Sequence, residues 1–225
     1  MLLTSMFTDA KKMIRAIIFD MDGVLVDSEP FHLEIEKRQF ELNNLLISAQ
    51  EHHRYMGMAS DLMWREIARG HALPMTVEAL IEQNKAETMR FFSEVEEIPV
   101  MPGLVELLEK LTKKNYPMAV ASSSYPEVIE IILQRTGLRR YFQKVVSSQE
   151  AGKSKPEPDV FLLAARRLGM NPEDCLVIED SKNGIRAARA AQMRCIAFEG
   201  PGANPANQKE ADEVVKSFDQ LGRML

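Results

Sequence analysis

Two aspartates spaced by one residue, Asp20 and Asp22, directly follow an apolar run that begins near Ile14. Side chains at positions i and i+2 of an extended chain point to the same side, so the two carboxylates can face one volume of space. Gly23 allows the backbone to turn sharply after them. Two like charges this close repel, and a bound cation or a raised pKa on one partner relieves the repulsion. Hard oxygen ligands suit Mg²⁺, although an isolated pair with this spacing is also typical of a solvated turn.

Two further polar clusters each end a short apolar run, and a lysine precedes a proline. These residues are Ser122 with Ser123, Glu179 with Asp180, and Lys155. Carboxylates bind a divalent cation, backbone N–H groups near a helix start favour an anion, and lysine supplies positive charge. Together they describe an anion held against Mg²⁺, for which phosphate is the natural candidate. The cation and the lysine would neutralise the repulsion between phosphate and an attacking carboxylate. We interpret Asp20 as a nucleophile that forms an aspartyl-phosphate and Asp22 as a general acid and base.

The elements that must position these residues are strands and helices that alternate on both sides of a helical segment. Strands are predicted at residues 14–20, 118–121, 144–148, 175–178 and 194–198, with helices between them, whereas residues 30–97 show only helical patterns. This alternation predicts a parallel sheet that is covered on both faces, and ligands bind at the carboxyl ends of the strands in such sheets. We therefore expect an α/β core, residues 14–29 and 98–225, that is interrupted by an all-helical cap, residues 30–97.

Composition and charge bound the classes of partner. The chain has 225 residues, and 28 lysines and arginines against 33 aspartates and glutamates give a net charge of −5, so it lacks the basic footprint of a nucleic-acid-binding protein. Its apolar runs are shorter than the ~20 residues that span a bilayer, so we expect no membrane partner. The first thirteen residues do not resemble a signal peptide. Cys175 and Cys195 lie beside apolar runs, as expected for buried, reduced thiols in a cytoplasmic protein.

The histidines and the tryptophan of the predicted cap carry weaker signals. His32 either contacts the substrate, orients Asp22 or lies on the cap surface. His52 and His53 are adjacent on a predicted helix and cannot face one ligand together, so we expect solvated side chains at both positions. Trp64 is expected in the cap interior.

The sequence resembles the haloacid dehalogenase (HAD) superfamily through four ordered motifs that cover nearly the whole chain. The motifs are Asp20-Met21-Asp22-Gly23-Val24, Ser122, Lys155-Pro156-Glu157-Pro158-Asp159 and Glu179-Asp180-Ser181-x-Asn183-Gly184. The stretch Val26–His32 is also similar to the opening of the small helical cap in the β-phosphoglucomutase-like branch.

The resemblance implies a Rossmann-like core with a cap that closes over the substrate. It also implies a role for each motif residue. Asp20 would be the nucleophile and Asp22 the acid/base, while Ser122 and Lys155 would bind the transferred phosphoryl group. Mg²⁺ would be held by Asp20, Asp180 and the backbone carbonyl of Asp22, with Glu179 at or just behind the metal.

Within this branch the sequence favours a phosphatase over a mutase. The mutase pattern carries Lys and Asn shortly after the motif serine, where this chain has Tyr125 and Pro126. It also carries Lys and Arg around a cap glycine, where this chain has the uncharged residues 56–60. A mutase must hold a second phosphate, for which positive charge is expected. We therefore expect a monomer or weak dimer that hydrolyses a small phosphorylated metabolite such as a sugar phosphate. The alternatives are a β-phosphoglucomutase-type mutase and, less favoured, a phospho-receiver protein, whose single domain would lack the helical insertion.

Overall fold

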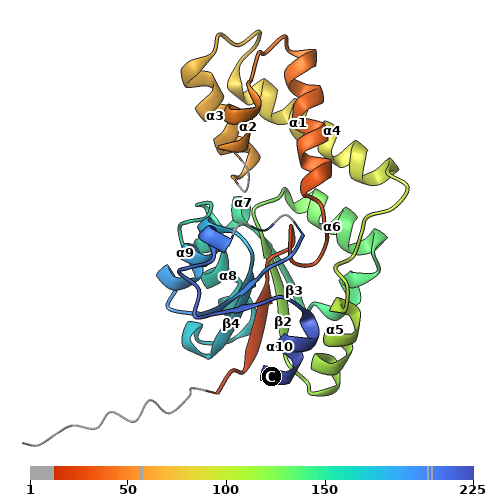
Figure 1. Cartoon of the computed structure of the whole chain (residues 1–225), viewed down its shortest axis with the longest axis vertical. Coiled ribbons are helices and arrows are strands. Elements are labelled where there is room, and N and C mark those ends of the chain that lie inside the picture. The colour runs from red at the N-terminus through yellow and green to blue at the C-terminus, as the bar shows by residue number, and fades with distance from the viewer. Residues whose placement is uncertain (1–12, 56–57, 202, 204) are drawn as a thin grey trace, which may run out of the picture.

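The computed structural model describes residues 13–55, 58–201, 203 and 205–225, and it consists of a helical cap above an α/β core (Figure 1). The cap comprises α1 (Glu29–Leu42), α2 (Ala49–His53), α3 (Ser60–Gly70) and α4 (Val77–Glu94), all of which lie between β1 and β2 in the chain. The strands of the core are β1 (Ala16–Phe19), β2 (Met118–Ser122), β3 (Lys144–Ser147), β4 (Cys175–Glu179), β5 (Arg194–Phe198) and β6 (Glu213–Val215). Its helices are α5 (Leu104–Lys113), α6 (Pro126–Arg135), α7 (Ser148–Ala151), α8 (Asp159–Leu168), α9 (Lys182–Ala190) and α10 (Phe218–Met224), with 3₁₀-helices at Leu138–Tyr141, Pro172–Asp174 and Pro205–Asn207.

The strands form one parallel sheet in the order β3-β2-β1-β4-β5-β6. The central strand β1 reads Ala-Ile-Ile-Phe and is buried on both faces, as expected for a parallel strand covered by helices. Its side chains alternate between the faces: Ile17 and Phe19 pack towards α5, α6 and α10, whereas Ala16 and Ile18 pack towards α8 and α9. This confirms the predicted α/β fold with a parallel sheet.

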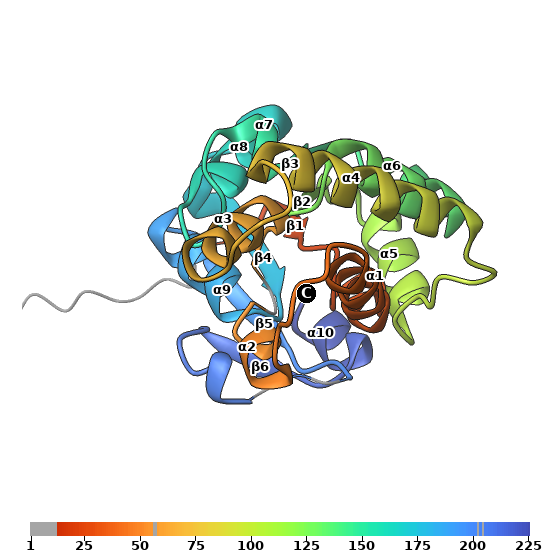
Figure 2. The same cartoon turned by 90° about the horizontal axis from the view of Figure 1, so that it is seen from above.

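The cap has an apolar cluster of its own. Phe40 of α1, Trp64 and Ile67 of α3 and Leu80 of α4 are buried together, so Trp64 lies in the interior as predicted. Seen from above, the cap helices lie over the ends of the sheet strands (Figure 2). Helix α4 also contacts α6 of the core, where Lys85 is paired with Glu127 at 2.8 Å.

Two linkers connect the cap to the core, and they run side by side. The amide of Asp27 donates to the carbonyl of Pro99 at 2.9 Å, and the amide of Met101 donates to the carbonyl of Leu25 at 3.0 Å. We place the division between the predicted domains, 14–29 with 98–225 and 30–97, at this pair of linkers, and it stays a prediction.

The predicted strands agree with β1–β5 to within two residues, but strand β6, helices α7 and α10 and the short 3₁₀-helices of the core were not predicted. Strand β6 lies at the sheet edge, where Val214 is 41% exposed, so it lacks the apolar run that marks a buried strand. Helix α7 has only four residues and is held by a capping box between Ser147 and Glu150. The third element, α10, covers the sheet through Phe218 and Leu221.

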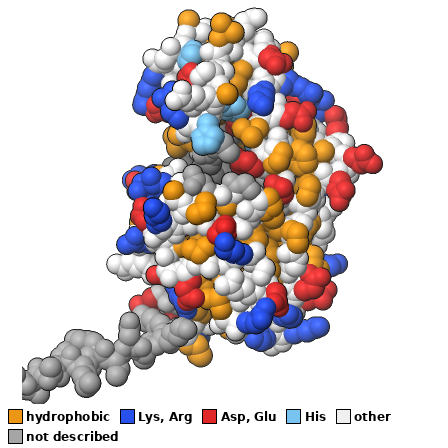
Figure 3. Space-filling model, viewed as in Figure 1, with side chains coloured by type: hydrophobic (Ala, Val, Ile, Leu, Met, Phe, Trp, Pro, Cys, Tyr) orange, Lys and Arg blue, Asp and Glu red, His pale blue; other side chains and the backbone are white. Residues whose placement is uncertain are grey.

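The prediction that His52 is solvated is wrong. Its side chain is 7% exposed because Glu36 of α1 lies 2.5 Å from its Nε2 atom and the ring of Phe40 packs against it at 5.0 Å. Its neighbour His53 is exposed, as expected. Both cysteines are buried and free. Among the described residues, none of the helices combines the length and apolar character that crossing a bilayer requires. On the face shown in Figure 3, acidic and basic side chains are interspersed.

Candidate active site

Three neighbouring strands bring polar residues together at the carboxyl end of the sheet. Asp20 follows β1, Ser122 ends β2 and Glu179 ends β4, and β1 pairs with both of the other strands. Because the strands are parallel, their carboxyl ends meet, and a cavity of about 110 Å³ lies there beneath the cap. On its core side the cavity is lined by Asp20, Asp22, Ser123, Ser124, Lys155 and Asp180.

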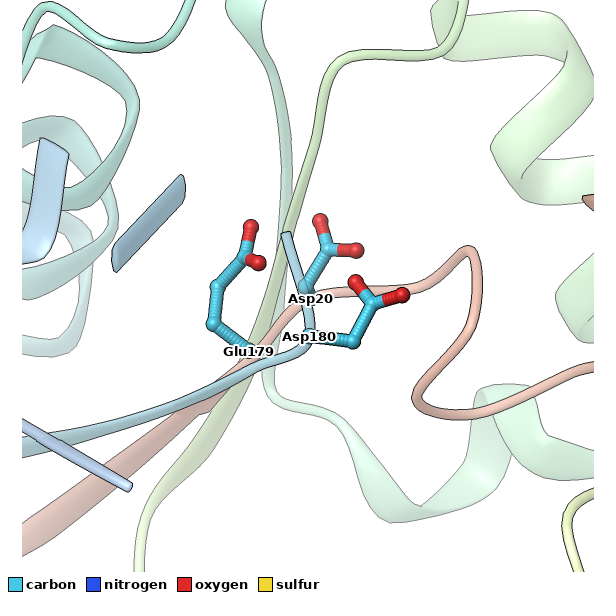
Figure 4. Close-up of side chains that lie close together, drawn as sticks. All are labelled: Asp20, Glu179 and Asp180. Carbon is cyan, nitrogen blue, oxygen red and sulfur yellow. The ribbon is translucent and has the colours of Figure 1, made fainter. Parts of the chain in front are cut away.

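Three carboxylates at the carboxyl end of the sheet form a compact cluster, the acidic group. Oxygen atoms of Asp20, Glu179 and Asp180 lie within 4.8 Å of one another, and the side chains converge (Figure 4). Lys155 is buried beside them, and its Nζ atom donates to Asp20 at 2.5 Å and to Glu179 at 2.7 Å. One lysine cannot balance three ionised carboxylates, so the group carries surplus negative charge when all three are ionised.

The pKa values of Asp20 and Asp180 reflect burial first and this surplus of negative charge second. Burial raises the pKa of Asp20 to about 8 although Lys155 opposes the shift, and the charges of Glu179 and Asp22 add to it. Burial, followed by the charges of Glu179 and Asp20, also raises the pKa of Asp180 well above its ordinary value. A divalent cation would relieve this repulsion and keep the carboxylates ionised at neutral pH. The acidic group therefore fits a cation that prefers oxygen ligands.

Two glycines make room for these carboxylates. A Cβ atom on Gly23, whose φ is +78°, would lie 2.2 Å from the Oδ2 atom of Asp180. A Cβ atom on Gly184 would lie 1.6 Å from the Oε1 atom of Glu179. The amide of Ser181 donates to the other oxygen of Glu179 at 2.7 Å. Any larger residue at either glycine would therefore displace a carboxylate of the acidic group.

The side chain of Asp22 points to a different set of partners. Its Oδ1 atom accepts a hydrogen bond from the Ser28 hydroxyl at 2.5 Å and lies 3.1 Å from Nε2 of His32, while its Oδ2 atom accepts from the Ser124 hydroxyl at 2.9 Å. Burial opposes ionisation of Asp22, but the hydrogen bond and charge of His32 and the hydroxyl donors outweigh it and lower its pKa to about 2. Burial likewise opposes protonation of His32, yet the hydrogen bond and charge of Asp22 raise its pKa to about 9. The two residues therefore form an ion pair between core and cap at neutral pH.

The serine run that begins at the last residue of β2 consists of one buried residue and two partly exposed residues. Ser122 is fully buried, and its hydroxyl accepts from the amide of Ser124 at 3.0 Å and lies 3.4 Å from Asp22 Oδ2. Ser123 and Ser124 line the cavity just before α6 begins. A phosphoryl contact of the Ser122 hydroxyl stays a prediction.

The predicted site residues other than the buried Ser122 thus line one cavity, but their roles stay predictions. Asp20, Glu179 and Asp180 form the candidate metal group, and the side chain of Asp22 lies outside it. His32 reaches Asp22 from the cap. The sequence did not identify Ser28 or the hydroxyl of Ser124 as partners of Asp22. The only signal for Ser28 was its spacing of four residues from His32, which places the two on one side of a helical segment. The cap glycine at position 57, whose flanks lack the charges of the mutase pattern, lies outside the described residues.

Comparison with known proteins places this geometry in a family. Residues 14–192 match the model of the haloacid dehalogenase-like hydrolases. The chain is 33% identical to the phosphorylated carbohydrates phosphatase of Thermotoga maritima, over 81% of the chain and 84% of that protein. It is 34% identical to hexitol phosphatase B of Escherichia coli strain K12, over 93% and 95%. The crystal structure of β-phosphoglucomutase from Clostridium difficile superposes with a TM-score of 0.80 at 26% identity, over 93% of each chain. The chain belongs to the haloacid dehalogenase-like hydrolase family.

Proposed function

We propose that this protein is a Mg²⁺-dependent phosphatase that hydrolyses a small phosphorylated metabolite, of the sugar-phosphate class, through an aspartyl-phosphate on Asp20. The observation that carries the proposal is the convergence of the acidic group, Lys155 and the Asp22–His32 pair on one cavity at the strand ends. The phosphatase relatives, one acting on phosphorylated carbohydrates by its name, support the same reading.

In the first step, an oxygen of Asp20 attacks phosphorus, and the bond between phosphorus and the leaving-group oxygen breaks. Lys155 stays beside Asp20 and balances charge on the transferred phosphoryl group. Ser123 lines the cavity before α6, where its hydroxyl and backbone N–H group favour phosphoryl oxygens, whereas the amide and hydroxyl of Ser124 are engaged by Ser122 and Asp22. Mg²⁺, held by Asp20, Asp180, Glu179 and the backbone carbonyl of Asp22, would supply positive charge against the phosphate dianion.

Asp22 handles the proton in both steps. The Asp22–His32 pair holds one proton at neutral pH, and this proton resides on His32. As the leaving oxygen gains negative charge, His32 returns the proton to Asp22, and Asp22 passes it to that oxygen, which departs as an alcohol. Asp22 then accepts a proton from a water molecule whose oxygen attacks phosphorus. The bond between phosphorus and Asp20 breaks, inorganic phosphate forms, and the carboxylate of Asp20 is restored.

The lining of the cavity favours hydrolysis over mutase chemistry. Of the lining residues that the structure describes, Lys155 alone is a lysine or arginine, and it is engaged by Asp20 and Glu179. A mutase must hold a second phosphate at the far end of its substrate, and a cation is expected there.

The test is phosphate release with Mg²⁺ from a panel of small phosphate esters that includes β-glucose 1-phosphate, with glucose 6-phosphate followed in parallel. We expect free phosphate from several esters, no isomerisation, and loss of turnover when EDTA removes the metal. Isomerisation with little phosphate release would show a mutase, and turnover without any divalent cation would contradict the proposed metal group.

A further inference from the structure

One face of α1 forms part of the cap side of the cavity. Glu29, His32, Leu33 and Glu36 all line it, and their spacing of i, i+3, i+4 and i+7 places them on one stripe of the helix. His32 is engaged by Asp22 of the core. Glu36 follows one turn later, so it lies on the same face but further along the cap helix.

A second cap residue fixes the orientation of Glu36. This residue is His52, whose Nε2 atom lies 2.5 Å from Oε2 of Glu36. The ring of His52 is buried and packs edge-on against Phe40, with 5.0 Å between the ring centroids. The side chain of Glu36 is 17% exposed, and within the described part of the chain no hydrogen bond engages its Oε1 atom. The cavity is thus lined by a carboxylate that is held by one oxygen and has the other available as an acceptor.

The charges around Glu36 set what this acceptor can bind. Glu29 also lines the cap side, while the cations at the cavity, Lys155 and His32, are each paired with core carboxylates. A leaving group with a second phosphate or a carboxylate would meet the carboxylates of Glu29 and Glu36 on the cap side, and the described lining residues offer no unengaged lysine or arginine to bind it. A neutral leaving group that carries hydroxyls would donate a charge-assisted hydrogen bond instead.

We propose that Glu36 is a specificity-determining residue that accepts a hydrogen bond from a hydroxyl of an uncharged, polyhydroxylated leaving group and excludes leaving groups with a second anion. His52 is its positioning residue. The inference rests on the proposed phosphatase function and names the substrate class of that site, a monophosphate ester of a sugar or polyol.

The experiment compares three probes: fructose 1-phosphate, fructose 1,6-bisphosphate and p-nitrophenyl phosphate. The first two differ by one phosphate, and the third has a leaving group without an aliphatic hydroxyl. For the wild-type protein we expect kcat/KM for fructose 1-phosphate to exceed that for the bisphosphate by at least about tenfold. Glu36→Gln should narrow this ratio to about threefold or less, mainly through a lower KM for the bisphosphate, because the amide keeps an acceptor and removes the charge.

Glu36→Ala removes the acceptor as well. We expect the ratio of kcat/KM for fructose 1-phosphate to that for p-nitrophenyl phosphate to fall about 10- to 100-fold, as for loss of a hydrogen bond to a charged group. The matched control is Glu34→Gln, which neutralises a carboxylate on the same helix whose side chain is 58% exposed and lies 4.0 Å from Arg38. Glu34→Gln should leave unchanged the kcat/KM of fructose 1-phosphate relative to that of fructose 1,6-bisphosphate and relative to that of p-nitrophenyl phosphate.

The outcomes separate the two proposals. If the wild-type protein hydrolyses p-nitrophenyl phosphate but the Glu36 variants keep both wild-type ratios, the inference about Glu36 is overturned and the proposed function stands. The inference also falls if the wild-type protein does not prefer fructose 1-phosphate to the bisphosphate. If the wild-type protein releases no phosphate from any probe with Mg²⁺, the proposed function falls and the inference falls with it.

Discussion

The α/β core and the helical cap contribute to the same cavity by different means. The core supplies residues from the ends of three adjacent strands, and Asp20, Lys155 and Glu179 are each at most 7% exposed. The cap supplies one face of α1 and the chain between α2 and α3, supported by a separate small apolar cluster. The carboxylates of the acidic group lie at the ends of sheet strands, whereas Glu36, which would choose the leaving group, lies on α1 of the cap, a helix that packs against the core cluster through Ile35.

The comparison predicts that changes in the core act on every substrate alike, with Asp20→Asn as the most severe. The amide cannot form the aspartyl-phosphate, so we expect hydrolysis of all substrates to fall by at least about a thousandfold. Phosphate release measures the loss, and a circular dichroism spectrum like that of the wild type establishes that the variant is folded. Near-normal turnover would exclude Asp20 as the nucleophile.

Asp22→Asn should lower kcat for all substrates by about 10²–10⁴-fold, the usual contribution of a general acid or base. Magnesium affinity should persist because the Asp22 side chain lies outside the group formed by Asp20, Glu179 and Asp180. Titration calorimetry with Mg²⁺ provides the measurement. A large loss of affinity would mean that the side chain itself coordinates the metal.

Trp64→Ala tests whether the cap can be weakened alone. Trp64 is fully buried in the cap cluster, so the free energy of unfolding of the cap should fall by about 3–5 kcal/mol. We expect kcat/KM to fall while Mg²⁺ still binds the core. The matched variant is Phe19→Ala, which opens a cavity beneath the acidic group and should weaken Mg²⁺ binding as well. Equal loss of Mg²⁺ binding in both variants would show that cap and core unfold as one unit.

The smallest predicted effect concerns the contact between the two parts, the Asp22–His32 pair. The folded-state pKa of His32, about 9, lies above its ordinary value of 6.5. The pair therefore stabilises the fold fully between pH 3.8, the ordinary pKa of Asp22, and pH 6.5, and the contribution of His32 is lost as the pH rises through 9. In EDTA, wild-type stability should fall by about 1–2 kcal/mol more than that of His32→Gln between pH 6 and 9.5. Parallel pH curves for the two proteins, measured by urea unfolding, would exclude this linkage.

Much of the core was predictable because its signals are local. An apolar run that stops at Asp20, Ser122 or Glu179 indicates a buried strand. The polar residue that follows the run lies at the carboxyl end of that strand, where ligands bind in parallel sheets. The parallel sheet then brings these ends together, so the convergence of the predicted residues follows from topology. Strand β6 gave no such signal, since it has three residues and lies at the sheet edge.

The cap side of the site was harder to predict because its contacts join residues that are distant in the chain. His52 appeared solvated from its neighbours alone, yet Glu36 from another helix covers it. Ser28 is a single serine between a linker and a helix, and only the fold brings it to Asp22. A helical pattern predicts which residues share a face, but it does not say what that face meets.

The hydrogen-bonded linkers also bear on how this protein could be re-engineered. Because the backbone of Asp27 is hydrogen-bonded to Pro99 and that of Met101 to Leu25, the chain leaves the core and re-enters it through two adjacent linkers. A foreign segment spliced between these two points would need only ends that lie as close together as those of the present one. The two linkers therefore mark the points at which the cap could be exchanged for that of another protein. Chimaeras that keep this α/β core and carry a different cap would separate the contribution of the core to turnover from the contribution of the cap to substrate choice.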